Sequence, residues 1–186
     1  MKKIRGNLPN VLTFTNMSLG IVAILISVSE SKSNGIGGLI LASLLIMVAA
    51  ITDRFDGKVA RMLDATSELG KELDSLSDLI SFGVAPIVVT WKVSMVSLGL
   101  PGYLISLVFP IAGAYRLARY NVTEFDNFFR GIPITLAGAF LTIDNIYNCF
   151  VLMKKERLPI YHISVTIFLI IILSYLMVSK IRFKKV

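Results

Sequence analysis

Long runs of uncharged, mostly apolar residues constrain this chain more than any other feature. Six such runs lie at residues 11–28, 35–52, 79–91, 93–115, 131–143 and 158–179. A helix that crosses a membrane needs roughly 20 mostly apolar residues. The chain is also 55% hydrophobic, with a mean hydropathy well above zero, which is unlike an ordinary soluble domain. The sequence therefore predicts an all-α integral membrane protein with six membrane-spanning helices.

The shorter runs reach this length when their boundaries are adjusted. Residues 99–102 read Gly-Leu-Pro-Gly, a turn signal. The third helix is therefore expected to run from about Leu73 to Ser94, and the fourth to start near Tyr103. The fifth helix continues to about Met153. Six spans with short connections leave no room for a separate soluble domain.

We accordingly expect residues 1–186 to form one membrane domain, in which residues 1–10 are a short interfacial segment. Of the 19 Lys and Arg residues, fourteen fall on the N-terminal side of the spans and five on the other side. Cytoplasmic loops carry the excess of Lys and Arg, so both termini and the acidic stretch at residues 51–82 are expected at the cytoplasmic surface of the cell membrane. The net charge of +7 then reflects topology and attraction to anionic lipid, and a nucleic-acid partner is not expected.

Acidic side chains are concentrated between the second and third spans. Five Asp and two Glu occur within residues 51–82. Residues three or four apart share a helix face, which puts Asp53 and Asp56 together where the second span ends. Asp74 and Asp78 are one turn apart where the third begins. The sequence therefore predicts that four carboxylates can converge on one point.

Converging carboxylates repel one another unless a cation neutralises them. Carboxylate oxygens suit Mg²⁺ or Mn²⁺, and four carboxylates are enough to hold two such ions about 3.5–4 Å apart. His162 and Cys149 lie in other spans, which disfavours zinc. Small residues beside the acids, Gly57, Ala60 and Gly70, leave room for a bulky ligand to approach the backbone. The alternative is that the acids form ion pairs with neighbouring Lys and Arg on solvated helix ends.

The spacing within residues 53–78 is itself distinctive. It reads D-R-F-D-G-K-V-A-R, then eight residues, then G-K-E-L-D-S-L-S-D. This resembles the signature of the CDP-alcohol phosphotransferases, D-x2-D-G-x2-A-R-x8-G-x3-D-x3-D, and every fixed position is matched. Six membrane helices with the motif on the second and third are also that family's plan. Members transfer a phosphoryl-linked alcohol from a CDP-linked donor to a hydroxyl group and release CMP.

The resemblance implies a role for each matched residue. Asp53, Asp56 and Asp74 would be ligands of two divalent ions, Mg²⁺ or Mn²⁺. Asp78 would be the general base and an additional ligand. The CDP part of the donor would contact residues of the same motif, namely Asp56, Gly57, Ala60 and Arg61, with Gly70 providing clearance. A homodimer is also expected from the resemblance.

Three further segments bear on the acceptor. LISFGVAP at residues 79–86, YRLARYN at residues 115–121 and FRGIPIT at residues 129–135 resemble the phosphatidylserine synthase branch of the family, as does LPNVLTFTN near the N-terminus. Thr135 stands where this branch often has Pro. The resemblance implies that CDP-diacylglycerol and L-serine react to give phosphatidylserine and CMP.

Polar residues outside the signature are candidates for binding the substrates. The candidate acceptor-binding residues are Arg116, Arg119, Asn121 and Arg130. One of these arginines can bind the serine carboxylate through a two-pronged contact, or they can act as positive-inside anchors. Thr13 and Asn16 in the first span can line the nucleotide pocket, or can serve helix packing.

Other functions fit parts of the same pattern. Another member of the family would use glycerol 3-phosphate or inositol phosphate as acceptor, and a phosphorylated acceptor would need a denser basic pocket. An archaeal lipid is a further possible donor. A cation transporter would also bring acids together, but it usually holds its ion near the membrane midplane, whereas these acids lie at one end of their helices.

Overall fold

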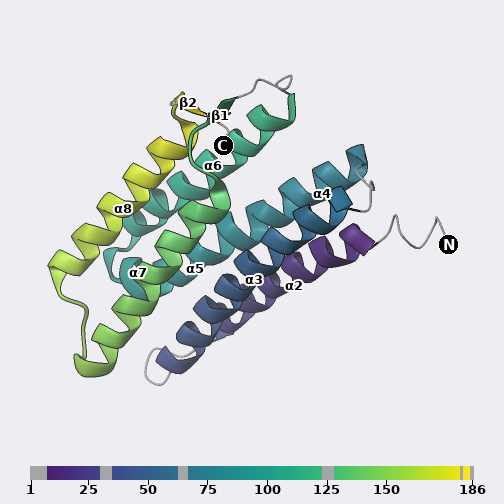
Figure 1. The fold of residues 1–186 in the computed structure, drawn as a ribbon. Helices are drawn as coiled ribbons and strands as arrows, with labels where there is room; N and C mark the ends of the chain where they lie inside the picture. Colours follow the sequence, from purple (N-terminus) through teal and green to yellow (C-terminus); the bar gives the residue numbers. More distant parts are fainter. Residues whose placement is uncertain (1–7, 30–34, 63–66, 123–127, 181, 185–186) are drawn as a thin grey trace.

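The computed structural model describes residues 8–29, 35–62, 67–122, 128–180 and 182–184. The predicted interfacial segment at residues 1–10 therefore lies largely outside the described residues. Six helical segments are long and apolar enough to cross a membrane, and Figure 1 shows them side by side in one bundle. Their bounds are α2 (Leu8–Ser29), α3 (Ile36–Met62), a continuous segment from α4 to η3 (Glu68–Leu98), α6 (Leu100–Val122), α7 (Ile134–Lys154) and α8 (Ile160–Val178). The prediction of an all-α integral membrane protein with six spans is confirmed.

The third segment is the most buried of the six and is built from five pieces. In chain order they are α4 (Glu68–Asp78), the π-helix η1 (Leu79–Val84), α5 (Ala85–Thr90), the π-helix η2 (Trp91–Met95) and the 3-10 helix η3 (Val96–Leu98). It begins at Glu68, earlier than the predicted start near Leu73. The side chain of Ser67 accepts a hydrogen bond from the Gly70 amide at 3.0 Å, and this cap allows the helix to start outside the apolar run.

The first π-helical turn follows from one proline. Pro86 has no N–H group and cannot bond to the carbonyl of Phe82 one α-helical turn earlier. The Ala85 amide instead donates to the Ile80 carbonyl five residues before it, so the helix widens. The wide turn begins immediately after Asp78. Turns of this kind are frequent at functional sites.

Helix α2 packs against α4 and η1 through two serine hydroxyls. Ser77 Oγ donates to the Thr13 carbonyl at 3.1 Å, and Ser81 Oγ donates to the Asn16 carbonyl at 2.9 Å. Both serines are buried. The opposite face of η1 packs against α7, where a Cβ added at Gly138 would lie 2.6 Å from the Phe82 carbonyl oxygen. The segment that follows Asp78 is therefore held from two sides.

The turn before α6 agrees with the Gly-Leu-Pro-Gly signal. Gly99 has a φ of 63°, a left-handed conformation that glycine adopts without steric cost. Helix α6 then begins at Leu100, three residues before the predicted start near Tyr103. Pro101 does not prevent this, because the first turn of a helix contains amides that need no intrahelical partner.

A short strand pair adds to the predicted helices. β1 (Phe128–Arg130) pairs antiparallel with β2 (Arg182–Lys184), and Figure 1 shows the pair at the end of the bundle where α8 ends. Gly131 follows with a φ of 72°, and the Ile132 amide donates to the Leu176 carbonyl at 3.3 Å. β1 and the two residues that follow it are therefore hydrogen-bonded to the end of α8 and to β2.

Candidate metal centre

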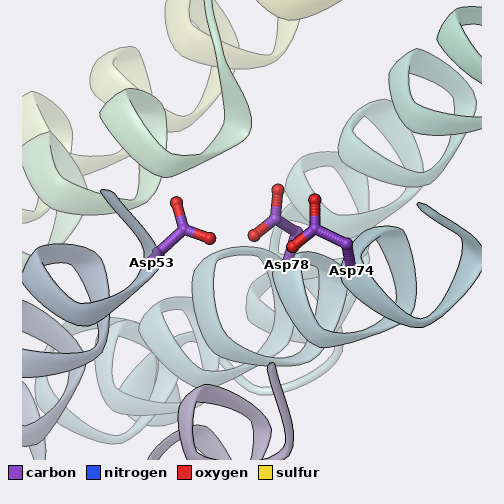
Figure 2. A group of neighbouring side chains, drawn as sticks. All are labelled: Asp53, Asp74 and Asp78. Atoms are coloured by element: carbon purple, nitrogen blue, oxygen red, sulfur yellow. The ribbon is translucent and has the colours of Figure 1, made fainter. Parts of the chain in front are cut away.

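Three carboxylates come together between two helices at one end of the bundle. Asp53 lies near the end of α3, and Asp74 and Asp78 lie one turn apart on α4. Each offers a carboxylate oxygen, and these oxygens lie within 4.8 Å of one another. Figure 2 shows the Asp53 side chain pointing across the gap between the helices toward the other two. The predicted convergence of α3 and α4 is confirmed for these three acids.

The surroundings of the three acids fit a hard divalent ion. Asp53 and Asp78 are half-buried, Asp74 is exposed, and Asp53 lies within hydrogen-bonding reach of Asp78. Carboxylates this close repel one another unless a proton or a cation lies between them. The donor set of the cluster is entirely carboxylate oxygen, which suits Mg²⁺ or Mn²⁺. The cluster therefore fits the divalent ions that the sequence predicts.

Thr135, at the start of α7, adds a hydroxyl to this cluster. Its Oγ1 lies 3.5 Å from Asp53 Oδ2, a long hydrogen bond. In the sequence, Thr135 stood out only because the phosphatidylserine synthase branch often has Pro at this position. Its link to Asp53 depends on the packing of α3 against α7, and spacing along the chain gives no signal for it.

Arg116 is the buried cation beside the cluster. It lies on α6, is only 8% exposed and is close enough to Asp78 for electrostatic attraction. Its Nε has no hydrogen-bond partner among the described residues. A buried guanidinium is costly to leave unpaired. Among the described side chains, this single buried guanidinium beside three carboxylates leaves negative charge in excess.

Arg119 lies one turn further along α6 and is engaged elsewhere. Its Nη1 donates to the Val178 carbonyl at 2.8 Å, at the last residue of α8, and its guanidinium carbon lies 5.8 Å from the Tyr115 ring centroid. A cation at a helix C-terminus satisfies a free carbonyl and interacts favourably with the helix dipole. This contact gives Arg119 a structural function.

Asn121 is bonded to helix α4. Its Nδ2 donates to both carboxylate oxygens of Glu72 at 3.2 Å and to Ser75 Oγ at 3.0 Å. The backbone carbonyl of Asn121 accepts a hydrogen bond from Lys71 Nζ at 3.2 Å. The sequence suggested Asn121 as an acceptor-binding residue and gave no signal for these partners.

The candidate nucleotide-binding residues of α2 differ in their contacts. Thr13 is buried, and Asn16 is fully buried with neither Nδ2 nor Oδ1 bonded to any described residue. A buried amide with both ends unsatisfied calls for a water molecule or a ligand. Gly70 faces its own cap and α2, because an added Cβ would lie 3.0 Å from Ser67 Oγ and 3.4 Å from Asn10 Oδ1. Its role toward the nucleotide stays a prediction.

The remaining candidate residues lie where no side chain is described. Helix α3 runs to Met62, so the backbone of residues 53–62 is helical as predicted. The side chains that lie outside the described residues are those of Asp56, Gly57, Ala60, Arg61 and Arg130. Their roles stay predictions.

The fold and the cluster define a polytopic membrane protein with a candidate divalent-metal centre at one end of its helices. Residues 6–181 match the CDP-alcohol phosphatidyltransferase family. The chain belongs to this family, as its signature predicts.

Curated relatives are similar over almost the whole chain. The CDP-diacylglycerol–serine O-phosphatidyltransferase of Helicobacter pylori (strain J99) is 36% identical, over 96% of this chain and 73% of the relative. The Bacillus subtilis (strain 168) protein of the same name is 34% identical, over 95% of this chain and 89% of the relative. An archaetidylserine synthase of Methanothermobacter thermautotrophicus is 33% identical, over 96% of this chain and 70% of the relative.

Proposed function

We propose that this protein is a phosphatidylserine synthase, which transfers the phosphatidyl group of CDP-diacylglycerol to the hydroxyl of L-serine and releases CMP. The observation that carries the proposal is the convergence of Asp53, Asp74 and Asp78 in a chain of the CDP-alcohol phosphatidyltransferase family. The names of the similar bacterial relatives support serine as acceptor. The whole chain acts as one membrane domain.

The carboxylates of α3 and α4 hold the metal. Asp53 and Asp74, together with Asp56 and Asp78, would bind two ions, Mg²⁺ or Mn²⁺. When bound, the ions supply positive charge that neutralises the pyrophosphate and stabilises the departing CMP. The long hydrogen bond from Thr135 helps to orient Asp53. A ligand whose second oxygen is already bonded keeps its orientation when the ion arrives.

Asp78 is the general base of the reaction. It removes the proton of the serine hydroxyl while the hydroxyl oxygen attacks the β-phosphorus of the donor. A bond forms between this oxygen and the phosphorus, and the bond between the phosphorus and the bridging oxygen of CMP breaks. Arg116 lies close enough to Asp78 for electrostatic attraction.

Arg116 is the residue best placed to bind the serine carboxylate. It is buried beside Asp78 and its Nε is available to a ligand. Arg119 is engaged at the end of α8. A single guanidinium matches one carboxylate through two parallel hydrogen bonds, whereas a phosphorylated acceptor would need more positive charge. This favours serine over glycerol 3-phosphate and inositol phosphate.

The CDP part of the donor lies along α2 and the first half of the motif. The unsatisfied amide of Asn16 supports a contact between α2 and a polar ligand, with Thr13 one turn before it. The motif residues proposed to contact the nucleotide are Asp56, Gly57, Ala60 and Arg61. The acyl chains stay in the membrane between helices.

Several features of the assembly are also proposals. The excess of Lys and Arg at the metal end supports a cytoplasmic position for the site and both termini, where soluble serine meets a lipid donor. A homodimer is expected from the family. The similarity to an archaetidylserine synthase leaves an archaeal lipid as the second candidate donor, with the same acceptor.

Purified protein supplied with CDP-diacylglycerol and Mn²⁺ tests the proposal. CMP release should depend on serine and should be absent with glycerol 3-phosphate or inositol phosphate. CMP release with either phosphorylated acceptor, and not with serine, would reject serine as the acceptor. Ion flux without CMP formation would favour a transporter. Replacing the donor with its archaeal ether-lipid counterpart distinguishes the two candidate donors.

A further inference from the structure

Asn121 lies at a junction between the last turn of α6 and the exposed side of α4. Five hydrogen bonds meet there. The amide nitrogen of Asn121 reaches Glu72 and Ser75 on successive turns of α4, and Ser75 Oγ can in turn donate to Asn121 Oδ1 at 3.4 Å. The backbone carbonyl of Asn121 holds Lys71. One residue of α6 therefore bonds to three residues of α4.

These contacts flank a proposed metal ligand in the sequence of α4. Asp74 lies between Glu72 and Ser75, and it is the exposed member of the carboxylate cluster. Ser77, one helical turn after Asp74, is hydrogen-bonded to α2. The part of α4 that carries Asp74 is thus attached to α2 by Ser77 and to α6 by the contacts of Asn121.

The contacts occupy both N–H donors of the Asn121 side chain. An asparagine amide has two N–H donors and one carbonyl acceptor. In this structure the donors face Glu72 and Ser75, and the acceptor faces Ser75. A residue that binds serine directly would need one of these groups to be available.

We propose that Asn121 is a positioning residue, which fixes α4 against α6 and so holds Asp74 at the distance from Asp53 that binding of the divalent ion requires. This inference rests on the proposed metal-dependent function. It assigns Asn121 to the metal side of the site, in place of the acceptor contact that the sequence suggested. Its partner on α4 is Glu72.

Mn²⁺ binding to the purified protein without substrate measures this role directly. Free Mn²⁺ is followed by its electron paramagnetic resonance signal during a titration. Residues that orient metal ligands typically change affinity by about 10- to 100-fold when they are removed. Because Asn121 acts through the helix, we expect Asn121→Ala to weaken Mn²⁺ binding by about tenfold, the lower end of this range. Glu72→Ala should act in the same direction.

A reciprocal exchange separates this specific contact from general damage. Asn121→Asp places two carboxylates against each other and should weaken Mn²⁺ binding. Adding Glu72→Gln restores a donor and an acceptor across the junction, with their direction reversed, and should recover most of the affinity. Glu68→Ala removes an exposed acid from the same helix and is the matched control, for which no change is expected.

The outcomes separate this inference from the proposed function. Unchanged Mn²⁺ binding in Asn121→Ala, with a raised KM for serine, would overturn the positioning role and restore the acceptor contact. If the unaltered protein itself binds no Mn²⁺, the metal-dependent function fails and this inference fails with it. Should Asn121→Ala not fold, Ser75→Ala removes only the contacts of Ser75 and leaves those of Glu72 and Lys71. A smaller shift in the same direction is then required.

Discussion

Asp144 and the three acids of the candidate metal centre have different surroundings in this protein. In the middle of α7, Asp144 Oδ2 accepts hydrogen bonds from Thr166 Oγ1 at 2.7 Å and from Asn148 Nδ2 at 3.0 Å. His162 is near enough for electrostatic attraction. At the end of α3 and α4, three carboxylates instead face one another within 4.8 Å. One acid has its partners in the protein, and the others are arranged for a partner that comes from outside.

The difference fits a structural role for Asp144 and the proposed metal-ligand role of the other three acids. An ionisable residue inside a membrane bundle is always a candidate for function. Asp144 links α7 to α8 through side chains that are themselves buried, so a structural role accounts for it. The three acids of the metal centre gain no comparable stabilisation from one another. A bound cation that neutralises their mutual repulsion would account for their arrangement.

Removing divalent ions should have the largest effect on activity, and it should act through the three acids of the candidate metal centre. A chelator is expected to abolish serine-dependent CMP release, because the metal centre then loses the charge that neutralises the pyrophosphate. Adding back Mn²⁺ or Mg²⁺ should restore it. Full activity in the presence of a chelator would show that the three acids do not act through a metal.

Asparagine substitutions compare one acid from each group. Asp78→Asn should slow turnover by about 10²- to 10⁴-fold, the usual contribution of a general base, while the CDP-lipid still binds. Asp144→Asn is the matched control and should keep turnover near that of the unaltered protein. Single-turnover CMP release and a donor-binding assay measure the two effects. Near-normal turnover of Asp78→Asn would remove it as the base.

Asp53→Asn examines the metal-ligand role on the other helix. Loss of a ligand should weaken Mn²⁺ binding by at least about tenfold, and donor binding should weaken with it because the pyrophosphate depends on the ion. Titrations with Mn²⁺ and with the CDP-lipid measure the two quantities separately. A metal dependence equal to that of the unaltered protein would exclude Asp53 as a ligand.

Thr166→Val gives the smallest expected effect and tests the structural group. The change removes the hydroxyl that donates to Asp144 and keeps nearly the same volume. Hydrogen bonds between membrane helices contribute about 0.6 to 1.7 kcal/mol, so the free energy of unfolding in detergent should fall by about 1 kcal/mol. CMP release should not change. A large loss of CMP release with normal stability would mean that the Asp144 group takes part in function.

Much of this description could be predicted from the sequence because its signals are local. Apolar length predicts the six spans. The spacing within each pair, Asp53 with Asp56 and Asp74 with Asp78, predicts which acids share a helix face. The predicted positions of the helix ends were less accurate, because a helix end depends on a single capping residue. The start of α4 at Glu68 follows from the Ser67 cap, and a capping residue is a weaker signal than a long apolar run.

Contacts between distant residues could not be predicted in the same way. Arg116 and Arg119 lie one turn apart on α6 and look equivalent in the sequence. Their neighbours separate them, because Arg116 is buried near Asp78 while Arg119 reaches the end of α8. Asn121 belongs to the same short segment, and its partners on α4 lie about fifty residues earlier in the chain.

The sequence by itself determined the number of spans, the family and the acids of the signature. It could do so because hydropathy and motif spacing are properties of short stretches of chain. The tertiary structure decided which polar residues of α2, α6 and α7 meet those acids. That choice depends on how the helices pack, and packing brings together residues such as Asp53 and Thr135 that no local pattern connects.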